Sequence, residues 1–122
     1  MDPPRSILIV EDDEAIRETL RLALELEGYS VRTASNGKEG IDALPEMPRP
    51  CMILLDLMMP VMDGWAFVKA LRLDMELASI PVVVVTAFSE RARDIRAEAI
   101  IKKPVDLDSM YEIVRGFCGP GA

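Results

Sequence analysis

The sequence predicts one α/β domain, built on a doubly wound, five-stranded parallel sheet with helices on both faces. Short runs rich in Val, Ile and Leu, with no polar alternation, are typical of strands buried on both faces, as in a parallel sheet. Segments with helical periodicity separate these runs, and alternation of strand and helix is the pattern of doubly wound domains. The chain has 122 residues, which is enough for one such domain.

The first half of the chain is expected to form two strands and two helices. The first strand covers residues 7–10. A helix follows, and its predicted core face consists of Ile16, Leu20, Ala23 and Leu24. Gly28 ends this helix, because glycine is favourable just after a helix C-terminus. Residues 29–34 form the second strand, and a weaker helix spans residues 38–44 before a proline-rich loop.

The second half is expected to form three strands and at least two helices. The predicted strands cover residues 52–55, 82–85 and 99–101. A loop over residues 57–64 leads into a helix at residues 65–73. The last helix begins near Asp106, a favourable N-cap, and its predicted core face consists of Leu107, Met110, Val114 and Phe117. The predicted domain covers residues 5–118, with flexible termini at residues 1–4 and 119–122.

Composition and charge exclude several classes of function. The net charge is −7 and no long Lys/Arg block occurs, so direct binding to nucleic acid is not expected. No apolar run is long enough to span a membrane and the N-terminus does not resemble a signal peptide, so we expect a soluble cytoplasmic protein. The chain has no histidine, which excludes a histidine-ligated zinc site and a Ser-His or Cys-His pair. Cys51 and Cys118 are interpreted as small hydrophobic residues, because their spacing suggests neither a metal site nor a redox pair.

Reactive polar residues follow four of the predicted strands. They are Glu11, Asp12, Asp56, Thr86 and Lys103. The carboxyl ends of parallel strands lie at one edge of a sheet, where such domains bind their ligands. We therefore expect these side chains to converge, although they are far apart in the sequence.

The expected cluster suits Mg²⁺ and phosphoryl chemistry. Two like charges about 4 Å apart repel by roughly 4 kcal/mol near a protein surface, so three carboxylates need a counter-charge. Oxygen ligands without His or Cys select Mg²⁺ or a similar ion, which shares its remaining positions with phosphate oxygens. Lys103 could pair with Asp56 at rest and with a phosphoryl oxygen later, and Thr86 offers a small donor. A carboxylate such as Asp56 can act as the nucleophile and form an acyl phosphate.

Some acidic residues have a simpler structural interpretation. Asp13 and Glu14 precede a helix, so capping is favoured over metal ligation. Asp63-Gly64 is first a turn signal. Asp56 differs from these, because an aspartate directly after a buried strand is costly unless it is paired.

Four segments together resemble the receiver (CheY-like) domain of two-component response regulators. They are Ile7-Leu8-Ile9-Val10-Glu11-Asp12-Asp13, Leu55-Asp56-Leu57-Met58-Met59-Pro60-Val61-Met62-Asp63-Gly64, Val85-Thr86-Ala87 and Lys103-Pro104. The match covers nearly the whole chain. The resemblance implies the flavodoxin-like strand order 2-1-3-4-5.

The resemblance also implies a role for each site residue. Asp56 would be the phosphoacceptor, with Thr86 and Lys103 holding the phosphoryl oxygens. Mg²⁺ would be bound by Asp12 and Asp56 directly, by Glu11 through water, and by the backbone carbonyl of Met58. The Lys103-Pro104 peptide bond would be cis.

The implied partners are proteins. A histidine kinase or phosphotransfer protein would donate the phosphoryl group from a phosphohistidine, and a downstream protein would recognise the switched surface. The chain would be a regulator that catalyses only its own phosphorylation and dephosphorylation. It would be a monomer or a weak, phosphorylation-dependent dimer.

Two features depart from the family pattern. Receivers usually carry Tyr or Phe three residues before the lysine as a rotating switch, whereas this chain has Ile100. The stretch from Thr86 to Lys103 is about five residues shorter than usual, roughly a turn and a half of helix, so the fourth helix should be short or distorted. Within this stretch, Arg91, Arg93 and Arg96 form a basic cluster, for which a solvated face is favoured over a docking patch.

Three alternatives remain open from the sequence. The chain is interpreted as a stand-alone receiver, but it could be a fragment of a larger response regulator or hybrid kinase. A small phosphatase with an aspartyl nucleophile would share the chemistry, although it would ordinarily want an acid where this chain has Met58. A flavodoxin-like FMN binder would share the sheet, but no Ser/Thr/Gly-rich phosphate loop follows the first strand.

Overall fold

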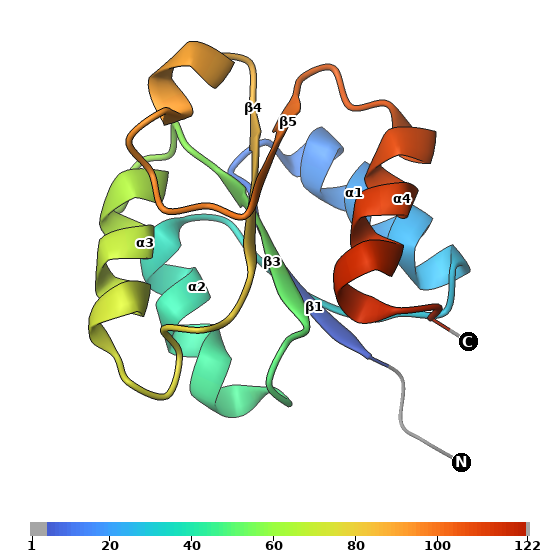
Figure 1. Ribbon diagram of the computed structural model, residues 1–122, viewed down its shortest axis with the longest axis horizontal. Helices are drawn as coiled ribbons and strands as arrows, with labels where there is room; N and C mark the ends of the chain where they lie inside the picture. Colours follow the sequence, from blue (N-terminus) through green and yellow to red (C-terminus); the bar gives the residue numbers. More distant parts are fainter. Residues whose placement is uncertain (1–4, 122) are drawn as a thin grey trace.

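Five parallel strands form a single sheet in the computed structural model, which describes residues 5–121 (Figure 1). The strand order is β2-β1-β3-β4-β5, as the family resemblance implies. The strands are β1 (Ser6–Val10), β2 (Ser30–Ala34), β3 (Met52–Asp56), β4 (Val82–Thr86) and β5 (Ala99–Lys102). Each lies within one residue of its predicted range. For β1, β3, β4 and β5 the reason is that an apolar run ends abruptly at polar residues, whereas β2 (SVRTA) has polar and apolar residues mixed.

Helices cover both faces of the sheet: α2 and α3 lie on one side and α1 and α4 on the other (Figure 1). Their bounds are α1 (Glu14–Leu26), α2 (Gly37–Ala43), α3 (Gly64–Leu73) and α4 (Leu107–Cys118). Each begins after an Asp or Asn whose side chain accepts a hydrogen bond from a backbone N–H of the first turn; these caps are Asp13, Asn36, Asp63 and Asp106. Asp13 thus has the capping role favoured from the sequence.

Alternation along each strand divides the core into two layers. On β3, Ile53 and Leu55 pack toward α2 and α3, whereas Met52 and Leu54 pack toward α1 and α4. Because both layers are apolar, the three central strands are buried on both faces, whereas the edge strands β2 and β5 are partly exposed. The polar ends of the central strands are thereby held in fixed positions.

Between β4 and β5 the chain forms only a short 3₁₀ helix, η2 (Ser89–Ala92); a second one, η1 (Leu44–Glu46), follows α2. Residues 87–98 must return from the carboxyl edge of β4 to the amino edge of β5, which leaves too few residues for a helix of ordinary length plus two turns. Ala92 is buried on this face and Ile95 and Ala97 are partly buried. The prediction of a short or distorted fourth helix is confirmed.

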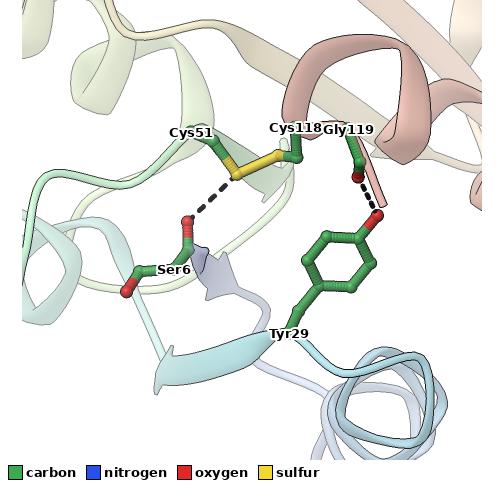
Figure 2. Close-up of a disulfide and its surroundings, with 5 residues drawn as sticks. All are labelled: Ser6, Tyr29, Cys51, Cys118 and Gly119. Carbon is green, nitrogen blue, oxygen red and sulfur yellow. Dashed lines mark hydrogen bonds between the residues drawn. A yellow bond between two sulfur atoms is a disulfide. The ribbon is translucent and has the colours of Figure 1, made fainter. Parts of the chain in front are cut away.

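The prediction for the two cysteines was wrong. Cys51 and Cys118 form a disulfide, with Cα atoms 5.3 Å apart (Figure 2). Cys51 directly precedes β3, and α4 runs back from the carboxyl edge to the amino edge of the sheet, so topology brings together residues separated by 67 positions. The buried face of α4 is accordingly Met110, Val114 and Cys118, while the predicted core residues Leu107 and Phe117 are 36% and 38% exposed.

The C-terminal residues 119–121 pack against the end of α1. The Tyr29 hydroxyl donates a hydrogen bond to the Gly119 carbonyl oxygen at 2.5 Å. A Cβ atom at Gly121 would lie 2.3 Å from the Glu27 carbonyl oxygen, so the backbones are in close contact. The expected flexible residues 1–4 and 122 lie outside the described part of the chain. Within residues 5–121, no helix is long and apolar enough to cross a membrane.

Candidate functional site

The polar strand ends meet in a cavity of about 250 Å³ at the carboxyl edge of the sheet, which we call the carboxyl-edge cavity. It is lined by Glu11, Asp12, Asp13, Ile16, Asp56, Met58, Thr86, Ala87, Phe88 and Lys103. Glu11, Asp56 and Thr86 are 2%, 6% and 1% exposed, so three polar side chains are held in a buried setting. The five side chains expected to converge are therefore neighbours.

The loop after β1 fixes the first two acids. The Glu11 N–H donates to the Ala34 carbonyl oxygen at 3.0 Å, which extends the pairing of β1 with β2 by one residue. Arg17, on the first turns of α1, donates from Nη1 to the Glu11 carbonyl oxygen at 2.9 Å and, more weakly, to that of Asp12 at 3.4 Å. Arg17 was not singled out from the sequence, although a basic residue one turn into a helix that follows two acids could have signalled this contact.

The loop after β3 presents Asp56. A Cβ atom at Gly64 would lie 2.7 Å from the Asp56 carbonyl oxygen, so α3 can begin this close to the strand end only with glycine. The loop contains a tight γ-turn, in which the Met62 N–H donates to the Pro60 carbonyl oxygen at 2.7 Å. At its centre Val61 has φ of 69°, which is strained for a β-branched residue.

The ends of β4 and β5 supply the hydroxyl and the lysine. The Lys103 N–H donates to the Thr86 carbonyl oxygen at 2.8 Å, which couples the two residues through the backbone. The Thr86 Oγ1 accepts a hydrogen bond from the Phe88 N–H at 3.0 Å. The Lys103-Pro104 peptide bond is cis, as the resemblance implies.

Lys103 is placed between two buried carboxylates. Its Nζ lies 2.7 Å from Glu11 Oε1 and 3.5 Å from Asp56 Oδ1. The sequence suggested pairing with Asp56, whereas the shorter contact is with Glu11. Glu11 is almost fully buried, and a buried carboxylate without a partner would be costly.

One lysine does not neutralise this cluster. Burial raises the pKa of Glu11 to about 7, against the opposing effect of Lys103. Burial also raises the pKa of Asp56, and the Asp12 carboxylate adds to this shift while Glu11 and Lys103 oppose it. Burial alone would lower the pKa of Lys103, but the hydrogen bond and charge of Glu11 and the charge of Asp56 outweigh it and raise this pKa.

The residues present fit a hard divalent cation. Glu11, Asp12 and Asp56 each offer a carboxylate oxygen, and these oxygens lie within 4.8 Å of one another. Burial raises the pKa of both Glu11 and Asp56, so a bound cation would favour the charged form of each carboxyl group. An all-oxygen donor set of this kind suits Mg²⁺.

The two unusual features of the sequence lie outside this cluster. Ile100 on β5 is 43% exposed and does not line the carboxyl-edge cavity. Of the basic residues in the short segment, Arg91 stacks on Phe88, with its guanidinium carbon 5.0 Å from the ring centre.

The fold and this cluster together define a class of protein: a receiver that carries an acidic pocket at the carboxyl edge of a 2-1-3-4-5 sheet. The family model of the response regulator receiver domain matches residues 7–115, and the chain belongs to this family of two-component regulators. Members of the family act as regulators rather than as catalysts.

The chain is similar to curated receivers over most of its length. It is 37% identical over 121 residues to the polar-differentiation response regulator DivK of Brucella anthropi, covering 95% of this chain and 98% of that protein. It is 38% identical over 114 residues to the DNA-binding dual master transcriptional regulator RpaA of Synechocystis, covering 89% of this chain and 47% of RpaA.

Solved structures show the same fold. The chemotaxis protein CheY4 of Vibrio cholerae superimposes with a TM-score of 0.84 at 26% identity, covering 94% of this chain and 99% of CheY4. The response regulator TrrA of Thermotoga maritima, solved in complex with Mg²⁺ and BeF, superimposes with a TM-score of 0.82 at 28% identity, covering 93% and 98% of the two chains.

Proposed function

We propose that the chain is a phosphoacceptor of a two-component phosphorelay, in which Asp56 receives a phosphoryl group. The observation that carries this proposal is the convergence of Asp56 with two further acids and Lys103 in one cavity. The Asp56 carboxylate oxygen would attack phosphorus as the nitrogen–phosphorus bond of a donor phosphohistidine breaks, and the released histidine nitrogen would take up a proton.

The neighbouring residues have separate proposed roles. Asp12, Glu11 and the Met58 carbonyl would hold Mg²⁺ with Asp56, and the ion supplies positive charge for the phosphoryl oxygens. Lys103 would move from Glu11 toward a phosphoryl oxygen, and Thr86 would donate its hydroxyl to another. Self-phosphorylation and self-dephosphorylation would be the only reactions that the chain catalyses.

We further propose that the chain is a stand-alone regulator, with a receiver domain that covers residues 5–118. The match to this chain covers nearly all of DivK, which supports a stand-alone regulator. The match covers only about half of RpaA, which is a longer protein. The donor would be a histidine kinase or phosphotransfer protein in the cytoplasm, and the output would be contact with another protein, with the chain as a monomer or weak phosphorylation-dependent dimer.

The test is intact-mass spectrometry after incubation with Mg²⁺ and acetyl phosphate. We expect the gain of one phosphoryl group, lost in the Asp56→Asn variant and after removal of the metal with a chelator. No mass gain in the wild-type chain would contradict the proposal. Turnover of p-nitrophenyl phosphate over many cycles would instead indicate a phosphatase.

A further inference from the structure

The disulfide fastens the last helix to the sheet at the edge opposite the carboxyl-edge cavity (Figure 2). Cys118 is the final residue of α4, and Cys51 lies directly before β3. The two residues are separated by 67 positions, so the bond closes a large loop and restricts the unfolded chain strongly. Lys103 and Pro104 lie just before the start of α4, so the disulfide and the carboxyl-edge cavity are at opposite ends of this helix.

The two cysteine residues differ in exposure. Cys118 is 1% exposed and packs in the same core layer as Met110 and Val114, whereas Cys51 is only partly buried. An external thiol should therefore react more readily at Cys51 than at Cys118.

The surroundings of Cys51 suit both redox states. Its sulfur lies 3.3 Å from the Ser6 carbonyl oxygen, a contact marked in Figure 2. A disulfide sulfur carries no hydrogen, so in the oxidised form this is only a close contact. After reduction, the Cys51 thiol would donate a hydrogen bond to the same oxygen.

We propose that Cys51 and Cys118 form a reversible thiol–disulfide exchange site, whose substrate is a low-molecular-weight disulfide such as oxidised glutathione. The Cys51 thiolate attacks one glutathione sulfur, and the first reduced glutathione leaves as the glutathione disulfide bond breaks. The Cys118 thiolate then attacks the Cys51 sulfur, and the second glutathione leaves. Two electrons and two protons pass from the cysteine pair to glutathione, and a partly exposed attacking thiol next to a buried resolving thiol suits this order.

The consequence of oxidation is confined to α4. In the reduced protein, the end of this helix is held by packing of Val114 and by the hydrogen bond between Tyr29 and Gly119. Oxidation adds a covalent link there and leaves the residues of the carboxyl-edge cavity unchanged. The redox state of the cysteine pair would therefore change how rigid the last turns of α4 are, without changing the capacity of Asp56 to accept phosphate.

The first experiment equilibrates the protein in buffers with different ratios of reduced to oxidised glutathione, followed by alkylation and intact-mass measurement. We expect a two-state conversion to an oxidised form lighter than the dithiol by two hydrogen atoms before alkylation. A chain that stays a dithiol in oxidised glutathione alone, or stays oxidised in excess reduced glutathione, would overturn the proposal.

Single variants test the order of attack. With oxidised glutathione, Cys118→Ser should form a mixed disulfide at Cys51 at least about tenfold faster than Cys51→Ser forms one at Cys118. Equal rates would overturn the assigned roles. Phosphorylation by acetyl phosphate, measured on both variants, shows separately that each is folded and that the carboxyl-edge cavity is intact.

Hydrogen exchange and thermal unfolding test the effect on α4. Oxidation should slow amide exchange in the last turns of α4 and raise Tm by about 10 °C. The double variant Cys51→Ser/Cys118→Ser should show neither change when the redox buffer is switched. Identical exchange in α4 of the oxidised and reduced wild-type protein would contradict the proposed consequence.

Discussion

At Glu11, burial and charge act against each other. The carboxyl group is 2% exposed and accepts a hydrogen bond from Lys103, yet its pKa is raised to about 7 because the cost of burying the anion exceeds the gain from the lysine. In the metal-free protein, Glu11 is therefore an acid that titrates near neutral pH rather than near pH 4 to 5.

This shift predicts how stability depends on pH. Between about pH 4.5 and pH 7 the folded protein binds the Glu11 proton more tightly than the unfolded chain does, so the free energy of unfolding falls as pH rises. We expect a loss of at most about 3 kcal/mol across this window in metal-free protein, measured by urea unfolding. Glu11→Gln should flatten the profile, and Mg²⁺ should restore stability at pH 7 or above. A Glu11→Gln profile parallel to the wild-type one would contradict this assignment.

Arg17 acts on the acids through their backbone. Its guanidinium hydrogen-bonds the Glu11 and Asp12 carbonyl oxygens, and losing such contacts costs about 1.5 kcal/mol. Removing its charge favours the divalent Mg²⁺ by about 1 kcal/mol at a separation of about 8 Å in water. The loss of the hydrogen bonds that position Glu11 and Asp12 outweighs the effect of removing the charge. Arg17 should therefore favour metal binding despite its positive charge.

We accordingly expect Arg17→Met to weaken Mg²⁺ binding by about twofold, with a small change in Tm. Isothermal titration calorimetry measures the affinity, and Arg17→Lys should recover part of it. Lys69→Met is the matched control, because it removes one positive charge from an exposed position on α3. Equal or tighter binding in Arg17→Met would show that the charge effect dominates.

Replacing glycine with alanine should have opposite effects on the free energy of unfolding at two positions, one at the start of α3 and one within α4. A Cβ at Gly64 would meet the Asp56 carbonyl oxygen at 2.7 Å and the Leu57 Cα at 2.8 Å, whereas a Cβ at Gly116 on α4 would have no neighbour within 4 Å. Gly64→Ala should lower the free energy of unfolding by about 1–3 kcal/mol and slow phosphorylation, because α3 must move away from β3. Gly116→Ala should raise the free energy of unfolding by about 0.5–1 kcal/mol.

Denaturant unfolding measures both changes. A neutral Gly64→Ala variant would show that the loop after Asp56 can relax without cost. A destabilised Gly116→Ala variant would mean that the exposed face of α4 has a contact partner.

The elements were predictable wherever local signals agreed. Four strands follow from apolar runs, and α1 and α4 begin directly after the caps Asp13 and Asp106, because an Asp side chain there satisfies free N–H groups. Asp63, interpreted from the sequence as a turn signal, also caps α3. The convergence of the strand-end residues also followed from topology alone, since parallel strands end at one edge.

What could not be predicted depends on side chains meeting across the fold. The disulfide requires knowing that α4 ends beside the start of β3, and the 67-residue separation carries no local signal. The choice of Lys103 between Glu11 and Asp56 depends on a balance of burial and distance, which sequence spacing does not encode. The buried face of α4 was predicted with Leu107 and Phe117, but the disulfide holds Cys118 inward and turns those two side chains toward the surface.

For the whole molecule, the question is how the proposed phosphorylation of Asp56 would change a distant surface. Residues 87–98 lie between Thr86 and β5, which ends just before Lys103. This segment takes the place of a full helix and contains few buried side chains. Ile100 lies on the edge strand at 43% exposure and has neither a ring nor a hydroxyl group to rotate. We infer that displacement of this short segment, rather than an aromatic rotor, carries the signal.

This inference predicts a specific pattern of hydrogen exchange. If Asp56 is the phosphoacceptor that we propose, beryllofluoride with Mg²⁺ should bind there in place of the phosphoryl group and draw Thr86 and Lys103 inward. Amide exchange in residues 87–98 should then slow by at least about threefold, with smaller changes in α1. Asp56→Asn should abolish the response. Ile100→Tyr should leave both its size and its location unchanged, since the position is not part of the relay. If the wild-type segment does not respond but the Ile100→Tyr protein does, the missing aromatic side chain limits signalling. Displacement of residues 87–98 then does not carry the signal in the wild-type protein.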